Sequence, residues 1–373
     1  MKICIMTSVH HYDDVRIYHK EAQTLRAQGF EVTIICPDFE GTDKNGIEFV
    51  RVDMPNSRFA RIITAPFRFL KAAKKVNAKS YHFHDPELIL TGIFLKKNAK
   101  VIYDIHEDVP RQILTKPYLK PFIAKISSRI VESFENYGAR QFYAIIAAAP
   151  VIYDRMIKQN KNTILVCNYP KLEEFEDMSN DGKTRENKVC YIGGITKIRG
   201  IFEMVDAVND LDVKLVLAGA FETDALKKQA EQRPGYQNVD YKGFLNREEI
   251  REVLSTSKAG LVTLYPTPTY MLSLPIKMFE YMIAEIPVIA SDFPYWQDIV
   301  DDAKCGLCIN PLDVNEIKAA IAYIIKNDDI AQEMGQNGRR MVLEKYNWDI
   351  EKKKLIILYN FQSDSIKHKE KVV

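Results

Sequence analysis

The feature that most constrains the fold is a regular alternation of short apolar runs with longer amphipathic ones, which continues along most of the chain. This alternation is typical of parallel strands joined by crossover helices. The apolar run at residues 2–7 is followed by apolar residues at helical spacing from Val15 to Leu25, and Gly29 then marks a helix end. The sequence therefore predicts an α/β fold built from βαβ units.

The alternation falls into two series. With 373 residues, the chain is longer than one hydrophobic core usually serves, so two domains are expected. The first series predicts strands at residues 2–7, 30–36, 47–52, 81–84, 100–104, 143–147 and 163–166. The second series predicts strands at residues 189–192, 214–218, 239–241, 259–262, 288–290 and 306–309, and two helices follow that meet near residues 346–348.

A polar, acidic segment separates the two series and predicts the domain boundary. We expect a Rossmann-like domain at residues 1–170, completed by a C-terminal helix at 348–373, then a linker at 171–187 and a second Rossmann-like domain at 188–347. Open α/β sheets bind ligands at the carboxyl ends of their strands. Two such domains predict an interdomain cleft lined by strand-to-helix loops.

Composition narrows the class of protein. The net charge of +2 gives no bulk attraction to nucleic acid, so no nucleic-acid partner is expected. Six scattered cysteines are typical of a reducing compartment, and the pair Cys305 and Cys308 lacks the other ligands of a zinc site. The first residues form a strand pattern rather than a secretion signal, and no apolar run reaches the ~20 residues of a membrane span. We therefore expect a cytoplasmic protein.

The most informative segment, residues 272–290, reads LSLPIKMFEYMIAEIPVIA. Pro275 favours the first turn of a helix, so the free amides around Ser273 and Leu274 are expected to form an anion site. Glu280, farther along this helix, offers a carboxylate to the two hydroxyls of a ribose. The alternative is a surface helix in which Glu280 forms a weak ion pair with the lysine one turn before it.

A second motif, YIGGITKIRG at residues 191–200, places a glycine turn and a cation between a strand and a helix. Gly193 and Gly194 let backbone amides approach a phosphate closely, and Arg199 offers a fork of donors that matches phosphate geometry. The alternative is an ordinary glycine-rich turn with a solvated arginine, because this motif alone is only moderately specific.

With these two motifs the chain resembles the family 4 glycosyltransferases, which have the two-domain GT-B fold. The resemblance covers nearly the whole chain, and the PxKxFEYM-type helix with its PVIAS-like strand is its most specific part. It implies retaining sugar transfer that needs no metal and no cofactor beyond the nucleotide-sugar co-substrate. It assigns Gly194 and Arg199 to the diphosphate, Glu280 to the ribose, Phe244 and Leu245 to the base, and Gly219 to the edge of the cleft. Turn chemistry is the alternative for the glycines and the base loop.

Two departures from the family bear on the donor. Many members carry a glutamate that touches the donor sugar at the position of Leu272, and an arginine at the position of Gly194. Without that arginine, the diphosphate is left to the remaining arginine, helped by Lys197 or Lys277. These departures leave the sugar and the base open.

In the first domain, the resemblance assigns His106 to catalysis. His106 follows a strand end, and in the family this histidine lies near the donor sugar, where its backbone carbonyl helps to stabilise positive charge at the anomeric carbon. His84 and Asp85 are expected to support this loop or to touch the acceptor, with a structural pair as the alternative. In the first βα loop, Asp14 is expected to cap the next helix and Arg16 to contact a ligand.

A metal ion is not expected. His82 and His84 lie one strand period apart and so share a side, which keeps zinc as an alternative there. His106 with Glu107 offers too few ligands. The one Asp-x-Asp motif inside a domain, at residues 210–212, precedes a strand and so lies at the wrong end of the sheet.

Two stretches of the first domain, residues 56–75 and 111–130, combine basic and apolar residues with no acid. This pattern is typical of an amphipathic surface that lies on an anionic membrane, where each basic residue contributes ~1 kcal/mol. The alternative is that the apolar members belong to the core and the basic members form a solvated face. We expect a peripheral position on the inner face of the cell membrane.

Together these observations predict a glycosyltransferase that moves a sugar from a UDP- or GDP-type donor to a glycan or polyprenyl-linked acceptor, in cell-surface polysaccharide biosynthesis. The first domain is expected to present the acceptor and the second to bind the nucleotide sugar. The alternatives are a nucleotide-sugar epimerase of the same fold and a non-catalytic subunit that binds nucleotide sugars. An NAD-dependent oxidoreductase is disfavoured because no GxGxxG motif follows a strand.

Overall fold

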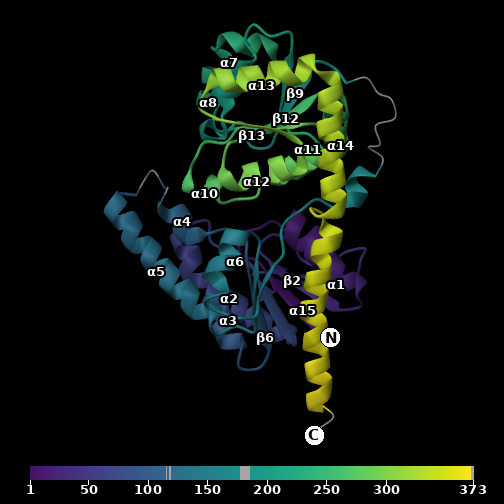
Figure 1. The fold of residues 1–373 in the computed structure, drawn as a ribbon. Coiled ribbons are helices and arrows are strands. Elements are labelled where there is room, and N and C mark those ends of the chain that lie inside the picture. The colour runs from purple at the N-terminus through teal and green to yellow at the C-terminus, as the bar shows by residue number, and fades with distance from the viewer. Residues whose placement is uncertain (115, 117–118, 177–184, 371–373) are drawn as a thin grey trace. The chain divides into compact units, whose positions relative to one another are not determined.

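The computed structural model describes residues 1–114, 116, 119–176 and 185–370, with side chains for all of these except 58 and 361–370. The chain divides into two compact units. Unit 1 contains Met1–Asn168 and the helix that begins at Trp348, and unit 2 contains Tyr169–Asn347. Each unit holds a mostly parallel sheet with helices packed against it, so the predicted α/β class with two Rossmann-like domains is confirmed (Figure 1).

The sheet of unit 1 has the strand order β3-β4-β2-β1-β5-β6-β7-β8, and every neighbouring pair is parallel except β3 with β4. All strands of the first series are confirmed, with ends shifted by no more than one residue. β3 is missed because two residues are too short for a period-two pattern. The bounds are β1 (Lys2–Met6), β2 (Glu31–Cys36), β3 (Gly41–Thr42), β4 (Glu48–Arg51), β5 (Ser80–Phe83), β6 (Lys100–Ile105), β7 (Ala144–Ala147) and β8 (Thr163–Leu165).

Helices cover the sheet of unit 1, whose central strands are buried on both faces, as parallel strands usually are. In one of the hydrophobic clusters of the unit, Trp348, Leu355 and Tyr359 of α15 (Trp348–Glu370) pack against residues of the sheet. The helix expected after β1 has two parts, a π-helical η1 (Val15–Ala22) and α1 (Gln23–Ala27). The other helices are α2 (Arg58–Val76), η2 (Pro86–Leu88), α3 (Ile89–Leu95), α4 (Val109–Leu114), α5 (Pro121–Ala139) and α6 (Pro150–Met156).

The sheet of unit 2 has the order β11-β10-β9-β12-β13-β14 and is wholly parallel. All strands of the second series are confirmed. The order reverses at β9, which has β10 on one side and β12 on the other, and such a reversal is where open α/β sheets bind ligands. The bounds are β9 (Lys188–Ile192), β10 (Lys214–Ala218), β11 (Val239–Gly243), β12 (Ala259–Val262), β13 (Val288–Ser291) and β14 (Gly306–Ile309).

The helices of unit 2 follow the expected positions, and the predicted break near residues 346–348 is confirmed because α14 ends at Glu344 and α15 begins at Trp348. Within the expected linker 171–187, η3 (Leu172–Phe175) is a short 3-10 turn, and residues 177–184 lie outside the described residues. The other helices are η4 (Lys197–Arg199), α7 (Ile201–Ala207), α8 (Asp224–Glu231), η5 (Pro234–Asn238), α9 (Arg247–Thr256), α10 (Pro268–Met271), α11 (Ile276–Ile283), α12 (Pro294–Ala303), α13 (Val314–Lys326) and α14 (Asp328–Glu344).

Candidate active site

The glycine turn after β9 is built by close backbone packing between β9 and β10. Gly193 has a φ of +133° and donates its amide hydrogen to the Ala218 carbonyl oxygen at 2.8 Å. Gly219 has a φ of +139°, and a Cβ there would lie 2.0 Å from the Gly193 carbonyl oxygen. Glycine is therefore required at both positions. The structure brings the predicted Gly193, Gly194 and Gly219 together at the carboxyl edge of the sheet.

Two cations face this glycine turn from different elements. Arg199, in η4, donates through Nη1 to the Gly194 carbonyl oxygen at 3.1 Å and through Nε to the Tyr270 hydroxyl at 3.3 Å. Lys277 reaches the turn from α11. A Cβ at Gly193 would lie 3.0 Å from Lys277 Nζ and 3.7 Å from Arg199 Nη1, so both cations reach the same glycine.

These two cations lack acidic partners. Within the described part of the chain, neither Arg199 nor Lys277 has a carboxylate oxygen within 4.0 Å. Lys277 Nζ lies 4.1 Å from the centre of the Tyr191 ring. Burial, together with the charge of Arg199, lowers the pKa of Lys277 to about 7, although Glu280 acts in the opposite direction. Cations without counterions beside a glycine backbone are an anion-binding arrangement. Of the two lysines left open by the sequence, Lys277 faces the turn, whereas Lys197 is exposed to solvent.

The start of α11 differs from the prediction. α11 begins at Ile276, one residue later than expected. The amide and the hydroxyl of Ser273 both donate to the Tyr270 carbonyl oxygen, and the Ser273 carbonyl accepts from Trp296 Nε1 at 2.7 Å. The prediction that the Ser273 amide is free for a phosphate is therefore wrong, because the end of α10 uses it. Leu274 is half-buried, and the first amides of α11 beyond it have no acceptor inside the helix.

Glu280 lies one turn beyond Lys277 on α11, and its side chain is 16% exposed. Its Oε1 accepts a hydrogen bond from Arg247 Nη1 at 3.1 Å, and Arg247 also lies 3.5 Å from Glu174 Oε2. Both Arg199 and Glu280 influence the charge of Lys277, so the candidate groups for diphosphate and ribose lie in one region of unit 2. Sequence reasoning missed Arg247, because it belongs to α9 and no motif surrounds it.

The loop after β11 presents an exposed aromatic ring. Phe244 is 90% exposed, and Leu245 beside it is half-buried. Gly243 has a φ of +67°, and its carbonyl accepts from the Gly219 amide at 2.6 Å, which ties this loop to the end of β10. An exposed ring fixed beside the glycine turn is suited to stacking on a planar base.

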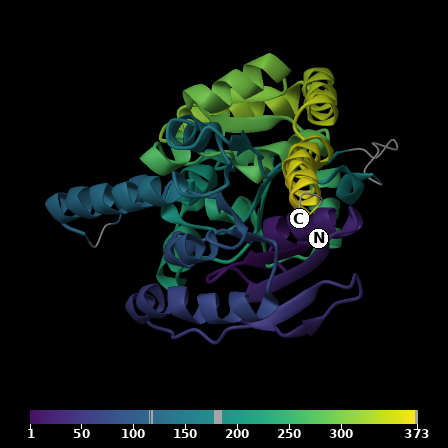
Figure 2. The same cartoon turned by 90° about the horizontal axis from the view of Figure 1, so that it is seen from below.

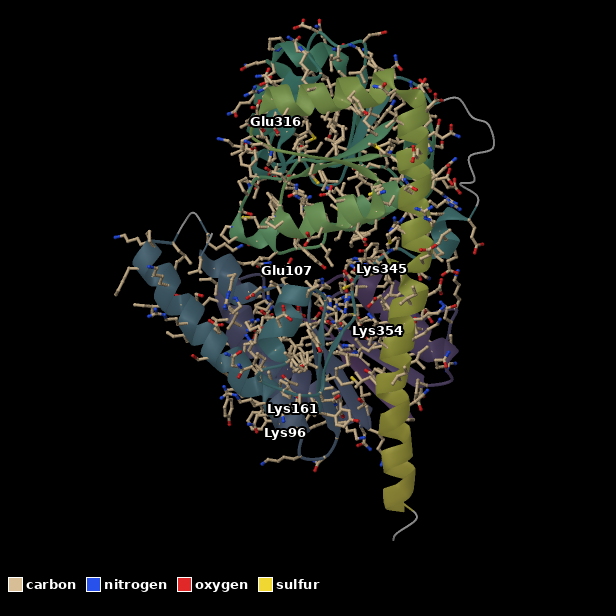
Figure 3. All side chains as sticks on the ribbon, in the orientation of Figure 1. Lys96, Glu107, Lys161, Glu316, Lys345 and Lys354 are labelled. Carbon is tan, nitrogen blue, oxygen red and sulfur yellow. The ribbon has the colours of Figure 1, made fainter. Side chains whose placement is uncertain are left out.

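In unit 1, His106 directly follows β6 at the carboxyl edge of the sheet. Figure 3 shows the neighbouring Glu107 at the opposite end of the unit from Lys96 and Lys161, which precede β6 and β8. His106 Nε2 lies 2.9 Å from His84 Nδ1, and the His106 side chain is 16% exposed. One ring nitrogen is therefore held by the protein while part of the ring remains accessible.

A cluster of buried charged groups adjoins His106, whose Nε2 lies 3.6 Å from Asp104 Oδ2. Arg16 is 3% exposed, donates through Nε and Nη2 to Asp104 at 2.8 to 3.1 Å, and donates through Nη1 to the Val166 carbonyl at 2.9 Å. Its Nε also lies 3.0 Å from Glu21 Oε1. The prediction that Arg16 contacts a ligand is therefore wrong, because its donors balance carboxylates inside the unit.

The titratable groups of this cluster have strongly shifted pKa values. Burial, followed by the charge of Asp104, raises the pKa of Glu21 well above its usual value. Burial opposes ionisation of Asp104 as well, but the adjacent Arg16 holds its pKa well below the usual value. Burial lowers the pKa of both His82 and His84. These pKa directions favour a cluster in which Arg16 and Asp104 are charged, the proton resides on Glu21 and both histidines are neutral.

This balance bears on the zinc site that the sequence leaves open. Glu21, His82, His84 and Asp104 offer ligand atoms that lie within 4.8 Å of one another. Because Arg16 already offsets one carboxylate, a divalent ion with neutral histidines would leave one net positive charge in a fully buried site. A single proton on Glu21 leaves none, so the charges fit a proton better than a divalent metal.

Asp85 and Asp14 hold the first loop of unit 1. Asp85 Oδ2 accepts from the Thr7 hydroxyl at 2.9 Å and from the Ser8 amide at 2.6 Å. Asp14 accepts from the amides of Arg16 and Ile17, the second and third residues of η1, both at 2.9 Å, and so caps this helix as predicted. Both carboxylates thus act on the backbone of the loop that follows β1.

Two helices of unit 1 expose apolar side chains beside basic ones. α5 exposes one row of six, Phe122, Ile123, Ile126, Ile130, Phe134 and Tyr137, with Lys125 and Arg129 also exposed. α2 exposes Phe59, Ile62, Ile63 and Phe67. The side chain of Arg58 and all of Tyr118, which belong to the predicted basic stretches, lie outside the described residues. Among the helices described, none is long and apolar enough to cross a membrane.

Two family models match the chain, one in each unit. The model for Glycosyltransferase Family 4 matches residues 15–167, and the model for Glycosyl transferases group 1 matches residues 173–341. Together they extend over most of the sequence and include both the His106 loop and the glycine turn with α11.

Individual proteins are similar to the chain at low sequence identity. The O-antigen chain mannosyltransferase C of Escherichia coli is 21% identical over 313 residues, which cover 79% of each chain. Among solved structures, sucrose-phosphate synthase from Thermosynechococcus elongatus matches with a TM-score of 0.75 and 17% identity, over 98% of this chain and 99% of the other. Anabaena HepE in complex with UDP-glucose matches with a TM-score of 0.71 and 15% identity, over 98% and 100%.

Proposed function

Because this chain belongs to the group 1 and family 4 glycosyltransferases of the GT-B fold, we propose that it transfers a sugar from a nucleoside diphosphate donor to a glycan or lipid-linked acceptor. The proposal includes retention of the anomeric configuration and a reaction that needs no metal ion. Unit 2 binds the donor, and unit 1 contributes His106 and the acceptor.

The observation that carries the proposal is the pair of cations at the Gly193 turn. Arg199 and Lys277 face one glycine and have no carboxylate partner among the described residues. A diphosphate supplies the missing negative charge, and Gly193 and Gly194 allow its oxygens to approach the backbone. A structural arginine would instead be expected to hold a carboxylate, as Arg16 does in unit 1.

The remaining donor groups follow from this placement. Glu280 accepts hydrogen bonds from the ribose hydroxyls, and Phe244 stacks on the base. HepE, which has the same fold, is known in complex with UDP-glucose, so UDP sugars are the first donors to test, followed by GDP sugars.

The chemistry requires a group that stabilises the leaving diphosphate. When the bond between the anomeric carbon and the phosphate oxygen breaks, negative charge develops on that oxygen, and fixed cations in a partly buried site lower the energy of that charge. Arg199 and Lys277 supply this stabilisation. His106 acts at the sugar, and the hydrogen bond to His84 holds its ring in position.

The acceptor is proposed to be part of a surface polysaccharide, by similarity to the O-antigen mannosyltransferase. α5 then lies on the anionic inner membrane leaflet, where its exposed row of apolar side chains enters the interface and Lys125 and Arg129 meet lipid head groups. In Figure 2, α5 projects from the rest of unit 1, which leaves this row accessible.

The donor proposal is tested by calorimetric titration with UDP and GDP sugars, on the wild type and on Arg199→Ala. Loss of hydrogen bonds to a charged group, worth about 1.5–3 kcal/mol, should weaken binding roughly 10- to 150-fold. Lys197→Ala removes an exposed cation from the same loop and should change affinity little. Equal effects of the two substitutions would contradict the assignment of Arg199.

Product analysis then separates transfer from the alternatives. Transfer requires an acceptor, whereas conversion of the sugar nucleotide alone would reveal an epimerase. Leu272 is an exposed apolar residue where many relatives have a glutamate, and this keeps a non-catalytic binding subunit as the second candidate. Donor binding without transfer to any glycan or polyprenyl-linked acceptor would favour that subunit.

The membrane proposal is tested by sedimentation with phosphatidylglycerol vesicles at low salt. The double variant Ile126→Ser and Ile130→Ser should lose most of its binding, because two apolar side chains leave the interface. Ile357→Ser, which changes an equally exposed isoleucine on α15, is the matched control and should bind as the wild type does. Equal binding by all three proteins would exclude α5 as the membrane surface.

A further inference from the structure

We propose that Lys277 is partly uncharged in the free protein at neutral pH and takes up a proton when the donor diphosphate binds. Donor binding is then coupled to proton uptake, with Lys277 as the group that responds to pH. The inference rests on the proposed function of unit 2 as the donor site, and it adds the charge state of that site.

The surroundings of Lys277 disfavour a permanent cation. Its Nζ lies near the Arg199 guanidinium, and its backbone belongs to the first turn of α11, which is the positive end of the helix dipole. The face of the Tyr191 ring, 4.1 Å from Nζ, attracts an ammonium group but accepts no ordinary hydrogen bond from it. No hydrogen-bond acceptor within the described residues holds the Lys277 ammonium group. Desolvation and a like charge both favour the neutral amine.

The other charged groups around Lys277 do not reverse this balance. The hydroxyl of Tyr270, from α10, accepts a hydrogen bond from Arg199 Nε and so does not act on Lys277. Glu280, one turn along α11, is a carboxylate whose charge favours the ionised Lys277, and its Oε1 accepts from Arg247 of α9. The positive charge of Arg247 thus weakens the attraction between Glu280 and the Lys277 ammonium group. The resulting pKa of Lys277, about 7, agrees with this geometry.

A bound diphosphate reverses the electrostatics of the site. A sugar nucleotide carries two negative charges on its diphosphate, and these would lie between Lys277 and Arg199. Opposite charges within about 4–6 Å favour the ionised lysine, so the proton is retained in the complex well above pH 7. The affinity for the donor is then highest below about pH 7. It falls by up to tenfold per pH unit as the pH rises, until the pKa of Lys277 in the complex is reached.

The sequence explains why the site is built in this way. Gly194 offers the turn no side chain, and Lys277 approaches the turn from α11. An arginine beside the turn would stay charged at every relevant pH. A lysine in a partly buried place changes its charge readily, so a permanent cation is replaced by one that titrates.

The first experiment reads the charge of Lys277 without a ligand. Lysines are acetylated competitively over a pH series, and the modified peptides are quantified by mass spectrometry, since only the neutral amine reacts. Lys277 should show a midpoint near pH 7, well below that of a lysine model peptide acetylated in the same series. Coinciding midpoints would overturn the inference.

The second experiment measures the coupling by calorimetry at pH 8, with UDP-glucose and GDP-mannose, in HEPES and in Tris, because a phosphate buffer would compete for the anion site. These diphosphate diesters have no group of their own that titrates near pH 7, so any uptake comes from the protein. With a free pKa of about 7, uptake should reach ~0.9 proton per donor bound. Lys277→Arg should bind with no uptake. Wild-type binding with no difference between the buffers would overturn the coupling.

The two experiments separate failure of this inference from failure of the proposed function. If neither sugar nucleotide binds at millimolar concentration, the donor assignment falls and the coupling falls with it. The acetylation midpoint still decides whether Lys277 is neutral. If binding occurs without uptake and Lys277 titrates like the lysine model peptide, the donor site stands and only the inference is refuted.

Discussion

Glu21→Gln and Asp104→Asn each replace one carboxyl oxygen by an amide nitrogen in the same buried cluster of unit 1, yet we expect opposite outcomes. Asp104 accepts three hydrogen bonds from Arg16, at 3.1, 3.1 and 2.8 Å. An asparagine places an amide group against the guanidinium and leaves the buried Arg16 charge without its counterion. Breaking a buried ion pair in this way costs about 3–5 kcal/mol.

Glu21 differs because burial and the charge of Asp104 favour its protonated form. Its pKa is raised well above the usual value, and neither of its oxygens accepts a hydrogen bond within the described residues, although Arg16 Nε lies 3.0 Å from one of them. That nitrogen points its hydrogen at Asp104 instead. Glutamine therefore replaces one neutral group by another, and the expected loss of stability is below ~1 kcal/mol.

The two variants also differ in their response to pH. The pKa of Glu21 is higher in the folded state than in the unfolded state. Its contribution to the free energy of unfolding is therefore present below about pH 4.5 and is lost as the pH rises. The stability of Glu21→Gln should therefore rise relative to that of the wild type as the pH increases from 5 to 8. Asp104 has a depressed pKa, so its contribution is present above about pH 4 and is lost in acid. The loss of stability of Asp104→Asn relative to the wild type should therefore be largest near neutral pH.

Urea unfolding followed by tryptophan fluorescence measures both effects. The chain has two tryptophans, Trp348 in unit 1 and Trp296 in unit 2, so a Trp296→Phe background reports unit 1 alone. An equal loss in Glu21→Gln and Asp104→Asn would refute the protonation of Glu21. A loss below 1 kcal/mol in Asp104→Asn would refute the role of Arg16 as its counterion.

Two further predictions concern unit 2. Gly219→Ala should destabilise the protein by about 2 kcal/mol more than Gly243→Ala in urea unfolding. Both glycines have a positive φ, but only a Cβ at Gly219 would press against the Gly193 carbonyl and disturb its hydrogen bonds. Equal losses of stability would show that this close approach is unimportant. Glu280→Ala should weaken donor binding about 10- to 100-fold in calorimetry, while Arg247→Ala, which removes an exposed partner worth at most ~1 kcal/mol, should change it less than about fivefold; the reverse order would place Arg247 rather than Glu280 on the ribose.

Most strands were predictable because they are short apolar runs, and several of these runs are buried on both faces of the sheet. Residues 3–6 of β1 and 259–262 of β12 are fully buried, and no polar residue interrupts them. The position of Gly193 and His106 followed from the same reasoning, since each comes directly after such a run. β3 has two residues and carries no such signal.

Side-chain direction was not predictable in the same way. Arg16 lies in the first strand-to-helix loop, where a ligand contact is a reasonable expectation, but its guanidinium turns inward because Asp104, 88 residues away, is buried within reach. The Ser273 amide likewise lies near a helix start, but the end of α10 uses it. Sequence spacing also could not show which of Lys197 and Lys277 lies beside the glycine turn, because this depends on how the side chains pack.

The two units share a strand topology but differ in how the charged side chains near the reversal of strand order are paired. In each sheet the first strand lies between the second and the fourth in chain order, if the two-residue β3 is left aside, so each has loops at a reversal of strand order. Near the reversal in unit 1, the charged side chains are paired with one another and sealed from solvent, which stabilises the loop that carries His106. Near the reversal in unit 2, Arg199 and Lys277 lie close together and have no carboxylate partner among the described residues, so their positive charges repel. Such repulsion opposes folding and is relieved by an anion, so a bound diphosphate should raise the stability of unit 2 while leaving that of unit 1 unchanged. A matched rise in both units would mean that the binding energy is not confined to the glycine turn.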